Sequence, residues 1–254
     1  MATQDFDSPH VAVVTGAARG IGLGIAAHLA RGGLTVALLD RDAATLDDTV
    51  SALAAEGLKV IGAAADLTDS AAVNEAFARV QAQAGRIDCL VNNAGAVRDM
   101  RFLSMRDEDW DLVIDTNLRS QFLCCRAALP GMVERGYGRV VNISSRAWLG
   151  GFGQANYSAA KGGVVSLTRS LAIEFAAKGI TVNAVAPGIV DTPLFRGFAP
   201  EVQARLQKSV PVQRIGTADD IANAVDFFLD PRSSYVTGQT LYVCGGRSLS
   251  SPSV

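Results

Sequence analysis

The chain has 254 residues, a formal net charge of −2, two histidines and four cysteines. There is no basic excess for nucleic acid, and neither His10 nor His28 has a carboxylate or cysteine at ligand spacing, which argues against a metal site or a Ser-His-Asp triad. The cysteines form no CxxC pair, and no uncharged run reaches the length of a membrane helix. We therefore expect a cytoplasmic protein without metal, nucleic-acid partner or membrane span.

Short β-branched runs alternate with longer helical patterns along the chain. The strands are expected at residues 11–15, 34–40, 59–66, 88–95, 138–144, 180–188 and 239–246. The first helix is expected at about 25–32, and the second is expected to run from the end of the second strand to about residue 56. The others are expected at 70–84, 107–135, 154–178 and 218–229. Continuously apolar strands indicate burial on both faces.

This rhythm predicts one α/β domain over residues 1–254. Its centre is a doubly wound parallel sheet of the Rossmann type, with about seven strands and helices on both faces. Residues 1–9 and 248–254 are expected to be tails. The long irregular stretch at 188–216 is expected to be a lid over a substrate.

A glycine-rich turn follows the first predicted strand and opens a helix, with the sequence Gly16-Ala17-Ala18-Arg19-Gly20-Ile21-Gly22. Glycine gives the turn its backbone freedom and leaves room for a pyrophosphate, which the free N–H groups of the helix N-terminus then bind. The spacing differs from Gly-x-Gly-x-x-Gly, and the Gly-Lys-Ser/Thr of a P-loop is absent. A turn that only closes the chain is the alternative interpretation.

Asp40 ends the second predicted strand. A carboxylate there binds the adenosine ribose hydroxyls and repels a 2′-phosphate, which favours NAD over NADP. Arg19 and Arg41 complicate this prediction because a guanidinium binds a 2′-phosphate, and a helix N-cap is another interpretation of Asp40. Asp66, followed by Leu67, ends the third strand in the same way and is expected to meet the adenine.

Six short motifs occur in the order Thr15-Gly-x3-Gly-Ile-Gly22, Asn92-Asn93-Ala94-Gly95, Asn117, Ser144-Ser145, Tyr157-x3-Lys161 and Pro187-Gly188. In this order the sequence resembles the short-chain dehydrogenase/reductase family, from about residue 11 to residue 246. The resemblance implies a nicotinamide-dependent oxidoreductase. It also implies a homotetramer, in which the helices at 107–135 and 154–178 pack between subunits.

Tyr157 and Lys161 are four residues apart in a helical pattern, so their side chains share one face of the helix. A free tyrosine has a pKa near 10. A nearby ammonium, helped by the charge of an oxidised nicotinamide, is expected to lower that pKa and let the phenol act as acid and base. An isolated Tyr-x3-Lys pair is more often a surface feature, and the accompanying motifs favour the catalytic interpretation.

The resemblance further implies a serine that binds the substrate oxygen. The Asn-x-x-Ser pattern that ends the strand selects Ser145, whereas the usual gap of about thirteen residues before the tyrosine selects Ser144. We favour Ser145, because strand alternation fixes the face to which a side chain points. By the same resemblance, the backbone at Asn117 is distorted and holds a water that relays protons from Lys161.

The other predicted contacts come from segments that border the same pocket. By the resemblance, those to the cofactor, which Tyr157 and Lys161 also contact, are Asn93, Ala94, Gly95, Pro187, Gly188, Val190 and Thr192. Those to the substrate are Arg98, Trp148, Phe152 and Phe195. Apolar groups with a cation at the rim suit a medium-sized hydroxy or keto compound.

The residues thus predict an NAD-dependent dehydrogenase of secondary alcohols, or reductase of ketones, with Tyr157 as general acid/base. An NADPH-dependent 3-oxoacyl thioester reductase is the alternative within the enzyme class. A protein that senses dinucleotides without turnover is the alternative outside it, although such a sensor needs only the glycine turn and Asp40.

Overall fold

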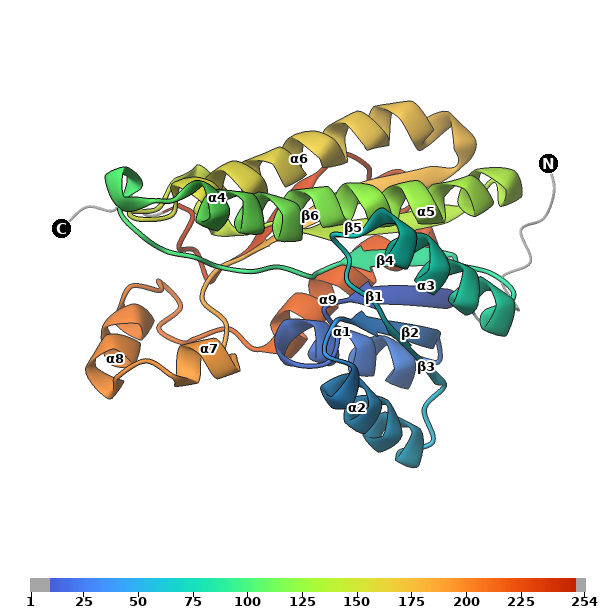
Figure 1. Cartoon of the computed structure of the whole chain (residues 1–254), viewed down its shortest axis with the longest axis horizontal. Helices are drawn as coiled ribbons and strands as arrows, with labels where there is room; N and C mark the ends of the chain where they lie inside the picture. The colour runs from blue at the N-terminus through green and yellow to red at the C-terminus, as the bar shows by residue number, and fades with distance from the viewer. Residues whose placement is uncertain (1–9, 250–254) are drawn as a thin grey trace.

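A computed structural model describes residues 10–249 and contains the predicted sheet at its centre (Figure 1). Seven strands run parallel in the order β3-β2-β1-β4-β5-β6-β7. Their bounds are β1 Val11–Thr15, β2 Thr35–Asp40, β3 Val60–Ala64, β4 Cys89–Asn92, β5 Gly138–Ile143, β6 Ile180–Pro187 and β7 Thr240–Val243. The chain reverses direction across the sheet between β1 and β4, and such a switch point opens a crevice at the carboxyl ends of the strands.

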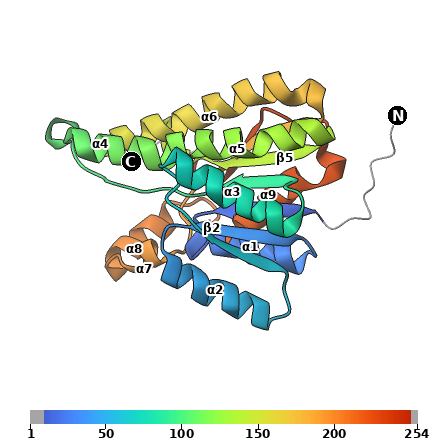
Figure 2. The same cartoon turned by 45° about the vertical axis from the view of Figure 1, so that its right-hand side comes forward.

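Helices cover both faces of the sheet, as a doubly wound fold requires (Figures 1 and 2). One apolar core joins the sheet to α1 (Gly20–Arg31), α2 (Ala43–Ala55) and α9 (Ala218–Leu229). The other joins it to α3 (Ser70–Ala84), α5 (Ser120–Arg135) and the end of α6 (Ala155–Phe175). None of the described helices combines the length and apolar character needed to cross a bilayer.

The helix ends carry the expected signals. Asp42 and Asp69 accept backbone N–H groups at the start of α2 and α3, and Thr217 forms a capping box with Asp220 at the start of α9. Gly85 ends α3 in the left-handed conformation, which glycine adopts without strain.

The helix predicted over 107–135 is divided into three parts. It consists of α4 (Asp107–Ile114), a π-helical turn η2 (Asp115–Arg119) and α5. The π turn lies where the resemblance implies a distorted backbone, and it contains Asn117. Such turns widen the helix by one residue and are frequent at functional sites.

The stretch predicted as irregular over 188–216 contains two helices, so that prediction was wrong. They are α7 (Pro193–Arg196) and α8 (Pro200–Lys208), and they form a lobe beside the sheet (Figure 1). Neither has a buried residue, and α8 is mostly polar, with Val202 and Leu206 one turn apart as its large apolar residues, so its sequence did not indicate a core helix. The sequence does carry other signals for α8, with Pro200 at its start and Lys208 in its last turn.

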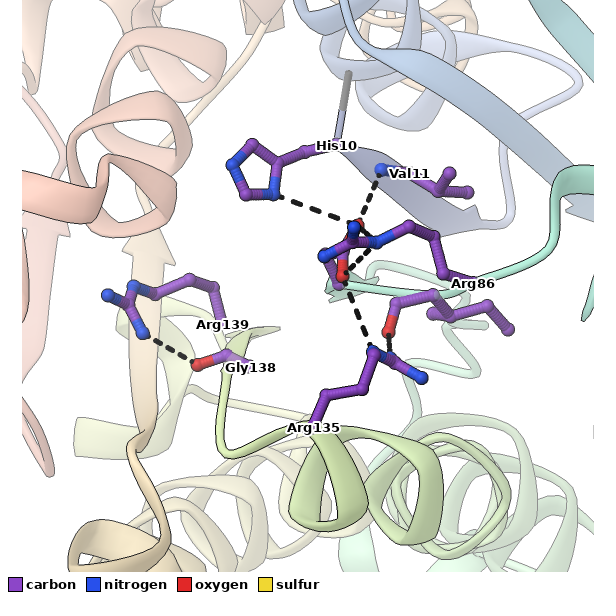
Figure 3. Close-up of polar contacts among 8 residues, drawn as sticks. His10, Val11, Arg86, Arg135, Gly138 and Arg139 are labelled. Carbon is purple, nitrogen blue, oxygen red and sulfur yellow. Dashed lines mark hydrogen bonds and ion pairs between the residues drawn. The ribbon is translucent and has the colours of Figure 1, made fainter. Parts of the chain in front are cut away.

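Charged side chains join several elements at the amino end of the sheet (Figure 3). Asp88 is fully buried and accepts the Val11 N–H at 3.0 Å and the Arg86 Nε–H at 2.9 Å. Arg135 Nε and His10 Nδ1 lie 3.8 and 3.7 Å from its two carboxylate oxygens. This carboxylate therefore ties the start of β1 to the end of α5.

The predicted tails lie largely outside the described residues, namely 1–9 and 250–254. Ser248 and Leu249, which were also assigned to the tail, form a turn. The Leu249 N–H donates to the Gly246 carbonyl at 3.0 Å, and the Ser248 N–H donates to Cys244 Sγ at 3.3 Å.

Candidate active site

A cavity of about 580 Å³ lies across the carboxyl ends of the strands. The β1–α1 and β2–α2 turns line one end of it, and the start of α6 lines the other. Turns that follow β4, β5 and β6 complete the wall. The cavity is thus placed where the sheet topology opens a crevice, and it is long enough to include both the glycine turn and Tyr157.

The glycine turn is fitted closely against the segment after β4. Gly16 has φ +62°, and a Cβ there would lie 2.8 Å from Ala94 Cα. A Cβ at Gly22 would lie 2.2 Å from the Gly16 carbonyl oxygen. The Asn93 amide donates to the carbonyls of Thr15 and Gly16, at 3.0 Å each. The glycines therefore let the turn pack against the segment after β4, and Gly16 leaves its part of the cavity wall without a side chain, as a pyrophosphate site requires.

Asp40 and Asp42 organise the turn after β2. Asp40 accepts the backbone N–H of Ala18 and that of Asp42, each at 3.1 Å, so its carboxylate joins the two turns at this end of the cavity. Asp42 is the N-cap of α2, and its carboxylate accepts the Thr45 N–H. The interpretation of Asp40 as a helix N-cap is therefore wrong.

Asp66 lies beside this end, and hydrogen bonds hold its carboxylate in place. It accepts the Thr68 N–H at 2.9 Å and the Thr68 hydroxyl at 2.8 Å. These bonds, with a smaller contribution from Arg41, keep the pKa of Asp66 below its usual range. The group is therefore an anionic acceptor at neutral pH.

Lys161 lies at the other end of the cavity as a buried amine. Only 3% of the residue is exposed, and its Nζ donates to the Ile143 carbonyl at 2.8 Å. Burial lowers the pKa of Lys161 to about 7. The group therefore titrates near neutral pH and is able to release a proton as well as hold one.

Tyr157 differs from the expectation in its pKa. Lys161 Nζ lies 5.6 Å from the centre of the Tyr157 ring. Burial nevertheless raises the pKa of Tyr157, a side-chain hydrogen bond with Ser145 opposes that rise, and Asp99 adds to it. Burial therefore outweighs any lowering of the pKa of Tyr157 by the lysine, contrary to the expectation.

The two adjacent serines point in different directions. The Ser144 hydroxyl is buried and donates to the Lys161 carbonyl at 2.9 Å, which joins the end of β5 to α6. The Ser145 hydroxyl accepts the Ala147 N–H at 3.1 Å and also hydrogen-bonds Tyr157. This orientation favours Ser145 as the serine that meets a substrate.

Asn117 is fully buried within the π turn. Its amide N–H groups donate to the carbonyls of Ala96 at 2.7 Å and Val113 at 2.9 Å. Its Oδ1 has no partner, and a Cβ placed on Gly95 would be 2.6 Å from that oxygen and 3.7 Å from Lys161 Nζ. An unpaired buried acceptor near an amine suits a bridging water, because buried polar groups otherwise carry a desolvation penalty.

Most of the predicted site residues come together in this one cavity. The predicted residues on its wall are Gly16, Arg19, Ile21, Asp40, Arg41, Asp66, Leu67, Asn93, Ala94, Gly95, Asn117, Ser145, Tyr157, Lys161, Pro187 and Gly188. The wall also contains Ser144, which was the alternative to Ser145. The wall residues that were not predicted are Asp42, Ala65, Thr68, Ala96, Val97, Thr116, Ser120 and Ile143. Most of these adjoin predicted ones, so the strand ends already indicated their position.

The remaining predicted residues lie away from the wall. Gly20, with φ +62°, shapes the turn, and Gly22 packs beneath it. Val190 is buried and forms a bridge with Gly216, and Thr192 caps α7.

None of the four substrate candidates lines the cavity either. Trp148 stacks on Tyr242 at 6.3 Å between ring centres, Phe152 is 91% exposed, and Phe195 meets Phe198 edge to face. Arg98 is exposed at the surface. Their positions near the pocket in sequence did not determine the direction of their side chains.

Comparison with known proteins shows the family to which the chain belongs. A family model described as enoyl-(acyl carrier protein) reductase matches residues 16–248. The chain is 47% identical to the (2S)-[(R)-hydroxy(phenyl)methyl]succinyl-CoA dehydrogenase subunit BbsD of Thauera aromatica, over 94% of this chain and 96% of that one. It is 41% identical to the 3-oxoacyl-[acyl-carrier-protein] reductase FabG of Escherichia coli, over 93% and 96%.

A solved structure has the same fold over nearly its full length. The crystal structure of a candidate gluconate dehydrogenase from Agrobacterium tumefaciens superposes with a TM-score of 0.92 and is 36% identical, covering 95% of this chain and 97% of that one. The chain belongs to the short-chain dehydrogenase/reductase family of oxidoreductases. The predicted family and fold class are confirmed.

Proposed function

We propose that this protein transfers a hydride between NAD(H) and a secondary alcohol or ketone. The observation that carries the proposal is one continuous cavity with the glycine turn at one end and Ser145, Tyr157 and Lys161 at the other. Gly16 and Gly95 lie on the wall and have no side chain that would narrow it, which suits a dinucleotide lying along the wall. When bound, the nicotinamide supplies the hydride acceptor or donor.

Tyr157 performs the proton transfer at the substrate oxygen. In alcohol oxidation the phenolate takes the hydroxyl proton, and in ketone reduction the phenol returns it. Ser145 hydrogen-bonds the same oxygen and is held for this by its contact with the Ala147 N–H. Burial raises the pKa of Tyr157, so alcohol oxidation is expected to quicken as pH rises above neutrality.

Lys161 and Asn117 supply the path for that proton. The Lys161 amine, whose pKa is about 7, has N–H donors beyond the one taken by the Ile143 carbonyl. The unpaired Oδ1 of Asn117 accepts from a water beside it. A proton passes in this way between Tyr157 and solvent without a histidine.

The cofactor is proposed to be NAD rather than NADP. The supporting observation is the pair of carboxylates, Asp40 and Asp42, on the wall at the end that receives the adenosine ribose. Asp40→Ala removes one of them and is expected to increase the use of NADP. An enzyme that already prefers NADPH contradicts this part of the proposal.

The substrate is proposed to be an acyl thioester with a hydroxyl or oxo group. Two similar proteins, BbsD and FabG, carry a CoA thioester and an acyl-carrier-protein thioester in their names. An NADPH-dependent 3-oxoacyl reductase is the second candidate, because FabG covers nearly the whole chain at 41% identity.

The lobe formed by α7 and α8 is proposed as the lid over the substrate. An ion pair between Arg196 and Asp191 joins α7 to the segment that precedes it.

A cytoplasmic homotetramer is proposed for the assembled protein. All four cysteines are free and buried, which suits a reducing compartment. Apolar side chains are exposed on α5 and α6, where Phe122 is 44% and Ile173 is 83% exposed. A subunit contact would remove them from water.

The test is a panel of hydroxyacyl and oxoacyl thioesters, simple secondary alcohols and ketones, followed by nicotinamide absorbance with NAD(H) and NADP(H). Tyr157→Phe is expected to reduce turnover about a thousandfold while leaving NADH affinity within twofold. Binding is measured by the fluorescence of NADH, and Tyr235→Phe at a fully exposed position is the matched control. Retained turnover in Tyr157→Phe removes the acid/base role of this residue.

A further inference from the structure

Two arginines and two aspartates surround the end of the cavity formed by the β1–α1 and β2–α2 turns. Arg19, Asp40, Arg41 and Asp42 all line the wall there. The formal charges of these four groups cancel. Because the net charge is zero, it neither attracts nor repels the 2′-phosphate of NADP. Whether that phosphate is accepted therefore depends on how the four side chains are arranged.

Arg19 is already engaged by one of the carboxylates. Its Nη2 forms an ion pair and a hydrogen bond with Asp42 Oδ2. This contact draws the guanidinium of the glycine turn toward the N-terminus of α2. The charge of Arg41 acts on another carboxylate, since it makes a small contribution to the lowered pKa of Asp66.

Asp42 is itself held firmly. Its Oδ1 accepts the Thr45 N–H at 3.2 Å, and its Oδ2 accepts the Thr45 hydroxyl at 2.9 Å. Its own N–H donates to Asp40 Oδ1 at 3.1 Å. Asp42 is thus a fixed carboxylate, whereas Arg19, with 58% of its side chain exposed, is a long and adjustable partner.

Resting on the proposed preference for NAD, we propose that Asp42 is a second determinant of cofactor choice and acts through Arg19. A 2′-phosphate has to compete with Asp42 for the guanidinium and also meets the negative charge of Asp40. A ribose hydroxyl needs neither arginine. Asp42 therefore selects against the phosphate although it is a positioning residue for Arg19 and a helix cap for α2.

The test uses two ligands that differ by one phosphate, 2′,5′-ADP and 5′-AMP, titrated calorimetrically against the whole protein. Asp42→Ser removes the carboxylate but keeps a side chain that caps helices well. This variant is expected to bind 2′,5′-ADP about tenfold more tightly, because a freed guanidinium makes charge-assisted bonds to phosphate. Its affinity for 5′-AMP is expected to stay within twofold of the original protein.

The double variant Arg19→Ala/Asp42→Ser separates the two explanations of such a gain. If Asp42 acts through Arg19, the double variant loses the tenfold gain for 2′,5′-ADP. A gain that persists without Arg19 overturns the proposal, as does an Asp42→Ser protein with unchanged affinity for 2′,5′-ADP. Asp48→Ser, on the exposed side of α2, is the matched control.

These titrations require no substrate, so they are read independently of the turnover panel. If no substrate is turned over but Asp42→Ser gains affinity, the enzymatic proposal fails and the role of Asp42 stands. If turnover is found with NAD and the titrations show no gain, only the role of Asp42 fails.

Discussion

The two ends of the sheet each bury a charged side chain, and they treat it in opposite ways. At the amino end, Asp88 is fully buried and is surrounded by Arg86, Arg135 and the Val11 N–H (Figure 3). At the carboxyl end, Lys161 is buried with a carbonyl as its hydrogen-bond partner and no carboxylate within 4 Å among the described residues. Burial consequently lowers the pKa of Lys161 to about 7.

The difference separates a charge that fixes the structure from one that is proposed to take part in proton transfer. A buried carboxylate with two guanidinium partners is compensated and fixes the segments around it. A buried amine without a counter-ion costs stability, and such groups are concentrated at sites where a proton has to move. Removing Asp88 at the amino end should therefore lower stability and spare turnover, whereas removing the uncompensated Lys161 at the carboxyl end should change how stability depends on pH.

The largest expected effect concerns the pH dependence of stability at the carboxyl end. Between pH 7 and pH 10.5 the unfolded chain keeps a proton on Lys161 that the folded protein has lost, so stability rises with pH. In this window the free energy of unfolding of the original protein should rise by about 1 kcal/mol per pH unit relative to that of Lys161→Met. Urea unfolding without cofactor measures both proteins. Lys178→Met, at an exposed position, is the control, and equal slopes in all three proteins contradict the prediction.

The next effect is at the amino end. Asp88→Asn should lower the free energy of unfolding by about 3 kcal/mol. This is the lower end of the range for breaking a buried ion pair, and it applies because Arg86 and Arg135 are partly exposed to water. Chemical denaturation measures this loss, and turnover per folded molecule should be unchanged. Asp48→Asn on the exposed side of α2 is the comparison. If Asp88→Asn abolishes turnover in a protein that is still folded, the division between the two ends is wrong.

The smallest effect separates two neighbours at the carboxyl end. Ser145→Ala should reduce kcat about a hundredfold with little change in stability, because this hydroxyl faces Tyr157. Ser144→Ala should leave kcat within a few fold and cost about 1 kcal/mol of stability, because its hydrogen bond to the Lys161 carbonyl is lost. Kinetics and urea unfolding of both variants give the comparison. The reverse pattern would assign the substrate contact to Ser144.

The sequence predicted the elements that bury an apolar face and was less successful with those that do not. Helices α3 and α9 have the predicted bounds, because their buried residues recur at helical spacing. Helix α8 was missed, because it has no buried residue. The acidic residue in its first turn and the basic residues in its last turn were the signals left in the sequence. In the cavity, residues at strand ends were placed correctly, since the carboxyl ends of parallel strands meet at one edge. Trp148 and Phe152 were placed wrongly, because Trp148 stacks on Tyr242 of β7 and Phe152 points into solvent.

By itself the sequence determined the succession of strands and helices along the chain and the position of the glycine turn. It also determined the spacing that puts Tyr157 and Lys161 on one helix face. Its scarcity of histidine indicated that the proton has to be handled by other groups, and the partly buried Tyr157 and the buried Lys161 are the groups proposed for that role. Only the tertiary structure decided the charge state of Lys161, the direction of the two serines and the pairing of Arg19 with Asp42. The physical reason is that pKa values and ion pairs depend on burial and on neighbours distant in the chain, which local patterns do not specify.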